Sequence, residues 1–229
     1  KDVITIYESQ YGKDNASYAG ALNNLAALYY KKGNYTTAED MYKEAAIIRK
    51  NRLGENHPDY ATTLNNLAIL YEHKANYAES ETLYKEALAI TKKTYGEKHP
   101  EYATGLSNLG LLYKSMGNYK AAETLHKQSF EITKEILGEN HPQYAINLIN
   151  MATVHILMGN FSQAEPMLKQ ALSINKNTFG ENHPKYALCL SNLASLYTSM
   201  SNYAAAEPLH KQALNIYKTT LGENHADYG

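Results

Sequence analysis

Histidine is the residue type of this chain best suited to acid–base or metal chemistry, because its pKa lies near neutrality and its ring binds metals. Five histidines recur every 42 residues: His57, His99, His141, His183 and His225. A metal site needs three or four converging ligands, and one ligand per repeat does not converge when repeats stack. We therefore expect these histidines to cap helices or bond to loops, and we predict no metal site.

The remaining candidates for chemistry also favour structural roles. The single cysteine, Cys189, lies near the start of a predicted helix beside the core residue Leu190, where a small core residue is commoner than a nucleophile. His126, His155 and His210 replace tyrosine or leucine of other repeats, so we expect half-buried packing. The chain contains no glycine-rich phosphate loop, HExxH motif or nucleophile elbow. We predict that the protein is not an enzyme and needs no cofactor.

Composition narrows the class of partner. The 229 residues are 44% hydrophobic and 20% charged, with a net charge of -1, which suits a folded core. A nucleic-acid partner or an anionic membrane would require a basic face. No apolar run approaches the ~20 residues that cross a bilayer, and the first residues lack an apolar signal core. With one cysteine and no possible internal disulfide, we expect a cytoplasmic protein that contacts neither nucleic acid nor membrane.

The elements that must position these residues repeat with the same 42-residue period. Glycine, tyrosine and histidine each recur at this interval, starting from Gly12, Tyr18 and His57. Such a period predicts a solenoid in which each repeat contacts only its neighbours. We assign five full repeats, at 13–54, 55–96, 97–138, 139–180 and 181–222, flanked by the end of one repeat at 1–12 and the start of another at 223–229.

Each repeat is predicted to contain two helices, which we name helix A and helix B. In the second repeat, Pro58 suits a first helical position, and apolar residues then recur at a helical spacing from Ala61 to Tyr71. Asn76 is a good N-cap for helix B, and Gly96 suits a left-handed C-cap. We expect about 16 residues in helix A and slightly more in helix B.

The pattern Leu64-x-x-Leu67-Ala68-x-x-Tyr71, followed by helix B, resembles a tetratricopeptide repeat. The 42-residue period, with Leu-Asn-Asn-Leu-Ala in helix A and Gly-Glu-Asn-His-Pro between repeats, is similar to kinesin light chains. The resemblance implies an all-α, right-handed superhelical solenoid of antiparallel helix pairs. It also implies a concave groove, lined by the A helices, that binds a segment of a partner protein. The heptad segment with which kinesin light chains hold their heavy chain is absent, so motor transport is not supported.

An asparagine recurs in every helix A, at the position that the resemblance places in the groove: Asn24, Asn66, Asn108, Asn150 and Asn192. An amide both donates and accepts hydrogen bonds, so this row could hold a peptide backbone whatever its sequence. The alternative is that each asparagine bonds to the neighbouring repeat and sets the stacking. Both interpretations stay open on the sequence alone.

Helix A of the fourth repeat is apolar nearly all round. Ile146, Ile149 and Ile156 stand at expected groove positions that are mostly polar in other repeats, and Thr153 completes this candidate binding face. An apolar anchor inside a polar rim is how interfaces concentrate binding energy. The alternative is tighter packing against the fifth repeat, which carries Leu188 at the matching edge.

Two functions remain in competition. The first is an interaction scaffold that binds a partner peptide of mixed polar and apolar character in the groove. The second is a structural or self-assembling spacer array within a larger multidomain protein. Solenoid ends without a polar capping helix leave apolar surface exposed, so end-to-end self-association of such molecules is an accompanying hypothesis.

Overall fold

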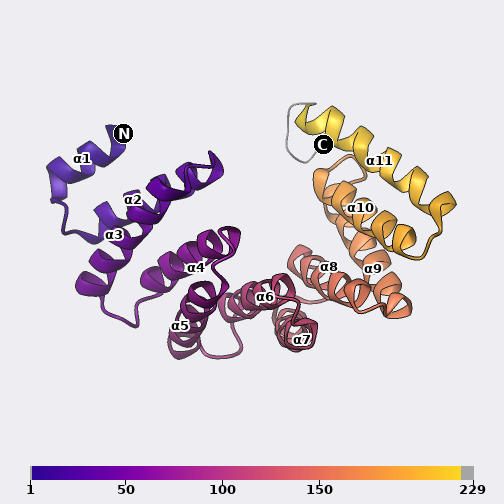
Figure 1. The fold of residues 1–229 in the computed structure, drawn as a ribbon, viewed down its shortest axis with the longest axis horizontal. Helices are drawn as coiled ribbons and strands as arrows, with labels where there is room; N and C mark the ends of the chain where they lie inside the picture. Colours follow the sequence, from indigo (N-terminus) through magenta and orange to yellow (C-terminus); the bar gives the residue numbers. More distant parts are fainter. Residues whose placement is uncertain (1, 223–229) are drawn as a thin grey trace. The chain divides into compact units, whose positions relative to one another are not determined.

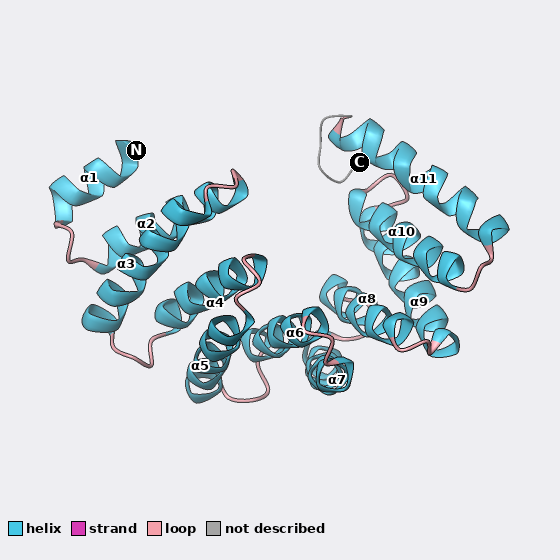
Figure 2. Cartoon of the chain, viewed as in Figure 1, coloured by secondary structure: helices cyan, strands magenta, loops and turns pink. Residues whose placement is uncertain are grey.

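The computed structural model describes residues 2–222, and every regular element among them is an α-helix (Figures 1 and 2). The eleven helices of this part of the chain are α1 (Asp2–Tyr11), α2 (Ala16–Lys31), α3 (Tyr35–Leu53), α4 (Pro58–His73), α5 (Tyr77–Tyr95), α6 (Pro100–Ser115), α7 (Tyr119–Leu137), α8 (Pro142–Leu157), α9 (Phe161–Phe179), α10 (Pro184–Ser199) and α11 (Tyr203–Leu221).

The helices pack in pairs, as the repeat predicts. In each complete pair, helix A has 16 residues and helix B has 19. The chain divides between Leu112 and Tyr113 into two compact units, and each unit is described by itself. The predicted all-α array of helix pairs is confirmed. The assigned stretch 223–229 and His225 lie outside the described residues.

The recurring histidines begin the A helices. His57 is the N-cap of α4, where its Nδ1 atom accepts a hydrogen bond from the Asp59 amide at 3.1 Å, and proline follows at the first helical position. The same bond forms at His99 (3.2 Å), His141 (3.1 Å) and His183 (3.1 Å). The capping role expected of these four side chains is confirmed.

The turn between helices A and B needs a left-handed residue followed by an N-cap. Glycine supplies the positive φ in three repeats, for example 77° at Gly117, but Ala75 (57°) and Ser201 (59°) adopt it as well. The asparagine that follows is the N-cap of each helix B, and the Asn118 side chain accepts from the Ala121 amide at 3.3 Å. Asn76 takes the N-cap position of α5 without such a side-chain bond.

In the first unit the core lies where helix B meets two A helices. Ala26 of α2, Ala38 and Tyr42 of α3, and Leu67 and Leu70 of α4 form one buried cluster. Each fully buried leucine contributes roughly 1.5–3 kcal/mol of stability. Alanine at the helix contacts lets the backbones approach closely, which explains why these positions stay small from repeat to repeat.

In the second unit one cluster joins α8, α9 and α10. It includes Leu148 and Ile149 of α8, Leu168 of α9, and Cys189 and Leu193 of α10. Cys189 is fully buried, and burial raises the pKa of its thiol, so the expected role of a small core residue is confirmed. None of the helices in the described part of the chain is long and apolar enough to cross a lipid bilayer.

Candidate functional site

One position of each helix A faces outward on the surface that we call the A-helix face. It is occupied by Gly20, Thr62, Thr104, Ile146 and Leu188. The threonines are exposed, and each donates its hydroxyl to a carbonyl four residues earlier in its own helix. Ile146 and Leu188 are 37% and 46% exposed. The face is therefore polar in the second and third repeats and apolar in the fourth and fifth.

The asparagine row of the first unit is partly engaged between repeats. Asn66 Nδ2 donates to Asn23 Oδ1 of the preceding helix A at 3.0 Å, so this amide links α4 to α2. Asn23 is buried, whereas Asn24 is exposed. Asn108 is half-buried. The Asn66 bond supports the stacking interpretation at that position, and the exposure of Asn24 leaves its amide accessible to a ligand.

In the second unit the asparagines are also half-buried. Asn192 Nδ2 donates to the Leu188 carbonyl of its own helix at 2.8 Å, and Asn150 lies at the equivalent place on α8. A donor already used within the helix is less free to clamp a peptide backbone. The row is therefore not a uniform ladder of identical open amides.

The isoleucines of α8 separate into two kinds. Ile149 is only 8% exposed and belongs to the core cluster with Cys189 and Leu193 of the next repeat. Ile156 is half-buried against the same cluster, and Thr153 donates its hydroxyl to the Ile149 carbonyl at 2.8 Å. The packing alternative thus accounts for Ile149, whereas Ile146 remains on the surface.

Sequence analysis missed Arg49 of α3, which is only 8% exposed. Its Nη1 atom donates to the Asp59 carbonyl at 2.8 Å and to the Thr63 hydroxyl at 2.7 Å. Burial lowers the pKa of the guanidinium, and the charge of Asp59 opposes that shift. Nη2 lies 3.6 Å from the place that a Cβ atom on Gly20 would occupy. Two features of the sequence could have indicated this contact. The first repeat has an arginine at a position of helix B that the repeat buries, and it is the one repeat with glycine on the A-helix face.

A hydrogen-bonded carboxylate ties helix B of the first repeat to helix A of the second. Glu39 accepts from Lys43 at 2.6 Å, from Lys74 at 2.6 Å and from the Tyr71 hydroxyl at 3.0 Å. Burial raises the pKa of Glu39, but these three donors outweigh it and hold the pKa at about 2. Tyr197 donates to Glu165 in the same way at 2.8 Å. These contacts stabilise the stacking of adjacent repeats.

The histidines that replace core residues differ from the expectation of half-burial. His126 is 1% exposed and His155 is buried, whereas His210 is exposed. His126 stands where Tyr42 and Tyr84 fill the core, and the helix pair covers it in the same way. Neither ring nitrogen of His126 has a hydrogen-bond partner. Burial, with a smaller effect of Lys114, lowers the pKa of His126 to about 4.

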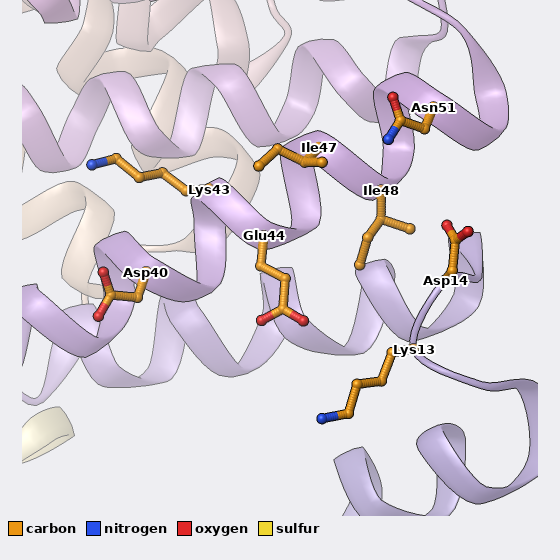
Figure 3. A pocket seen from close by; sticks show the side chains of 8 residues that line it. All are labelled: Lys13, Asp14, Asp40, Lys43, Glu44, Ile47, Ile48 and Asn51. Carbon is orange, nitrogen blue, oxygen red and sulfur yellow. The ribbon is translucent and has the colours of Figure 1, made fainter.

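A hollow of about 530 Å³ lies on helix B of the first repeat (Figure 3). Asp40, Glu44, Ile47 and Asn51 of α3 line this hollow, together with Lys13 of the loop between α1 and α2. Ile47 is exposed, so it offers an apolar side chain outside the A-helix face. It supplies a matched control for substitutions on that face. Among the described residues, no three histidine, cysteine or acidic side chains are placed to hold a metal ion.

Comparison with known proteins identifies the family of the chain. Models described as tetratricopeptide repeat match residues 17–93, 64–135, 102–177 and 187–227. No curated protein matches the chain.

Two solved structures share the fold. BtubC (BKLC) from P. vanneervenii has a TM-score of 0.75 and 24% identity, over 90% of this chain and 82% of that one. A Podosopora anserina protein with nearly identical TPR-like repeats of kinesin light chain type has a TM-score of 0.73 and 23% identity, over 90% of this chain and 98% of that one. At these identities the likeness is one of fold.

Proposed function

Because the chain belongs to the tetratricopeptide repeat family, a family of protein-interaction modules, we propose that it is a non-catalytic scaffold that binds a peptide segment of a partner on its A-helix face. We take the five repeats at 13–54, 55–96, 97–138, 139–180 and 181–222 as the structural units of this scaffold. We also propose that it acts in the cytoplasm and without a cofactor.

The observation that carries the proposal is the pair of exposed apolar side chains on adjacent A helices of the second unit. Ile146 of α8 and Leu188 of α10 occupy equivalent positions, and the two helices are in contact. Packing within the unit does not require them, since the core is already filled by Ile149 and its neighbours. An apolar pair beside the half-buried amides of Asn150 and Asn192 fits a peptide with an aliphatic anchor.

In the first unit the same face offers polar groups. Asn24 is exposed. Because Gly20 has no side chain, it does not cover the nearby Nη2 atom of Arg49. A fixed guanidinium in a partly desolvated place binds a carboxylate more strongly than a mobile surface cation does. These polar groups of the first unit favour a ligand segment that carries an acidic group where it meets the first repeat.

Selection from a random peptide library tests the proposal. Peptides enriched on the wild-type chain should bind the double variant Ile146→Asp, Leu188→Asp at least about tenfold more weakly, because an ionised carboxylate cannot share a desolvated apolar contact. The matched control is Ile47→Asp, which places the same charge on α3 and should leave binding unchanged. Peptides that bind both variants equally well would refute the A-helix face as the site.

A spacer or self-assembling array is the second candidate, and one observation favours it. Leu28 of α2 is 51% exposed, whereas the equivalent Leu70 and Leu112 are fully buried against a preceding helix pair. A second copy could cover this apolar surface. Sedimentation velocity separates the candidates: mass that rises with concentration, and that Leu28→Glu holds at the monomer value, would favour assembly over peptide binding.

A further inference from the structure

At each junction between full repeats, one residue of helix B lies opposite one residue of the next helix A. The chemistry of this pair differs from junction to junction. Near its end, each helix B places a side chain against the start of the next helix A. The pairs at the four successive junctions are Arg49 with Thr63, Thr91 with Gly105, Thr133 with Asn147, and Asn175 with Cys189. Asn147 Nδ2 donates to Thr133 Oγ1 at 2.8 Å, and Asn175 Nδ2 lies 3.1 Å from Cys189 Sγ. Three of the four junctions are thus closed by a side-chain contact.

At the first junction a guanidinium fills the space. Arg49 Nη1 is held by the carbonyl of Asp59, the second residue of α4, and by the Thr63 hydroxyl one turn later. The planar guanidinium, with its five donors, can bond to both of these acceptors at once. These two hydrogen bonds allow the arginine side chain to be buried at the first junction.

At the second junction both side chains are too small to fill the equivalent space. Thr91 turns its hydroxyl back to the Ala87 carbonyl at 2.8 Å. Gly105 has no side chain, and Leu88 Cδ1 lies 2.8 Å from the place that a Cβ atom there would occupy. A hollow of about 230 Å³ remains between α4, α5 and α6, which we call the second-junction hollow. Its lining includes Thr62 and Thr104, which belong to the A-helix face, so it opens on that face.

The second-junction hollow presents acceptors. The Oδ1 atom of Asn65, which lines it, is buried and has no hydrogen-bond partner. Asp59 and Glu101, in the first turns of α4 and α6, add two carboxylates, and Tyr95 adds an aromatic ring. A buried acceptor without a partner destabilises its surroundings, and a positive charge in the hollow would offset part of that cost.

The charges around this hollow favour a cation. The carbonyl end of α5, at Thr91 to Tyr95, carries a partial negative charge, while the amino ends of α4 and α6 carry partial positive charges that Asp59 and Glu101 offset. Lys92, on that turn of α5, is ion-paired with Glu97. From the first junction, Arg49 donates to the backbone carbonyl of Asp59, and its charge also acts on the Asp59 carboxylate.

We propose that the second-junction hollow binds a guanidinium group, supplied by an arginine side chain of the peptide on the A-helix face. The source of the group rests on the proposed function, whereas the chemistry of the hollow does not. The arginine enters between Thr62 and Thr104, close to the carboxylates of Asp59 and Glu101, in the hollow that corresponds to the place of Arg49 one repeat earlier. The ring of Tyr95, stacked on His99 at 4.4 Å, adds a cation–π contact.

Methylguanidinium is the probe, because it tests the hollow without any peptide. Titrated at low millimolar concentration against the whole ¹⁵N-labelled chain, it should shift the Asn65 side-chain amide and the Gly105 backbone amide in a saturable way. Sodium chloride and tetramethylammonium chloride at equal ionic strength should not produce these shifts, since neither cation donates hydrogen bonds. Shifts that are linear in concentration, or equal with tetramethylammonium, would overturn the proposal.

Two variants exchange the residues found at equivalent positions of the first and second junctions. Thr91→Arg places an internal guanidinium in the hollow and should weaken methylguanidinium binding at least about tenfold. Arg49→Thr empties the first junction and should create a second saturable site, reported by the Thr63 amide. This gain of a site does not depend on whether Thr91→Arg folds. If neither variant changes the number or affinity of sites, the assignment is wrong.

A peptide arm separates this inference from the proposed function. Among selected peptides, replacing arginine by citrulline should weaken binding about tenfold to the wild type and have no effect on Thr91→Arg. Saturable methylguanidinium binding without any peptide binding would overturn the proposed function and the peptide source while supporting the hollow. Peptides that bind regardless of arginine, on a chain that ignores methylguanidinium, would overturn the inference and leave the proposed function standing.

Discussion

His126 lies inside the core of its unit with neither ring nitrogen hydrogen-bonded, and an apolar residue would fill the place at lower cost. The fourth repeat has fully buried Leu168 at the equivalent position. We expect His126→Leu to raise the free energy of unfolding by about 1–3 kcal/mol, the usual cost of a buried unsatisfied polar group. Urea unfolding measures this, and Leu168→His is the reverse control. A destabilised His126→Leu would mean that the imidazole has a partner.

The same residue predicts acid sensitivity. Its pKa is about 4 in the folded chain, below the value near 6.5 of a free histidine, so the unfolded chain binds the proton first as pH falls. Stability should therefore be complete above pH 6.5 and decline by about 3 kcal/mol down to pH 4. Unfolding measured across this window should show the slope in the wild type, and His126→Leu should reduce it. Equal slopes in both proteins would contradict the assignment.

Glu39 predicts a second, lower window. Its pKa of about 2 lies below the ordinary 4.5, so the stabilisation from Lys43, Lys74 and Tyr71 is present above pH 4.5 and lost as pH falls toward 2. Tyr71→Phe removes one of the three donors and should cost about 1–2 kcal/mol at pH 7 and less at pH 3. Urea unfolding of this variant at both pH values checks the pairing. A cost that does not change with pH would place the effect of Tyr71 in packing alone.

At the scale of elements, the turn between helices A and B is strained where it lacks glycine. Ala75 and Ser201 hold φ values of 57° and 59°, which cost a residue with a Cβ atom about 1–2 kcal/mol. Ala75→Gly and Ser201→Gly should each stabilise the chain by about 0.5–1 kcal/mol, after the greater freedom of glycine in the unfolded chain. Gly117→Ala is the reverse control, since no atom lies within 4 Å of the added Cβ and only the backbone conformation is tested. Thermal unfolding gives the sign of each change.

Helix pairs could be predicted from the sequence because each depends on local signals that recur: histidine and proline at the start of helix A, glycine or a substitute before asparagine at the turn, and glycine after helix B. These signals act within a few residues, so one repeat suffices to find them. Burial at the junctions could not be predicted in this way. Whether Ile149 faces a ligand or the next repeat depends on how helix A rotates against its neighbours, and the structure places it in the core.

The burial of Arg49 could not be predicted from the sequence either. A charged residue in a helical pattern suggests a solvated face, and only the neighbouring Asp59 carbonyl, Thr63 hydroxyl and Gly20 explain its burial. Periodicity identified what the repeats share. The residues that differ between repeats, such as Arg49, Thr91 and Ile146, carry the candidate binding chemistry and require the packed structure to interpret.

At the scale of the whole molecule, the repeats share a common frame, and the residues that depart from it are the proposed binding residues of each unit. The first unit carries Arg49, Asn24 and the second-junction hollow, and the second unit carries Ile146 and Leu188. The roles of Asn24, Asn66, Asn108, Asn150 and Asn192 in binding stay predictions.

The most direct test is methyl NMR of the isoleucine-labelled wild-type chain titrated with a peptide selected on it. We expect the Ile146 methyl resonances to shift in a saturable way. The buried Ile149 should respond weakly, and Ile47 on α3 should not move. Saturable shifts at Ile47 with none at Ile146 would contradict the central claim, because they would place the partner on helix B and not on the A-helix face.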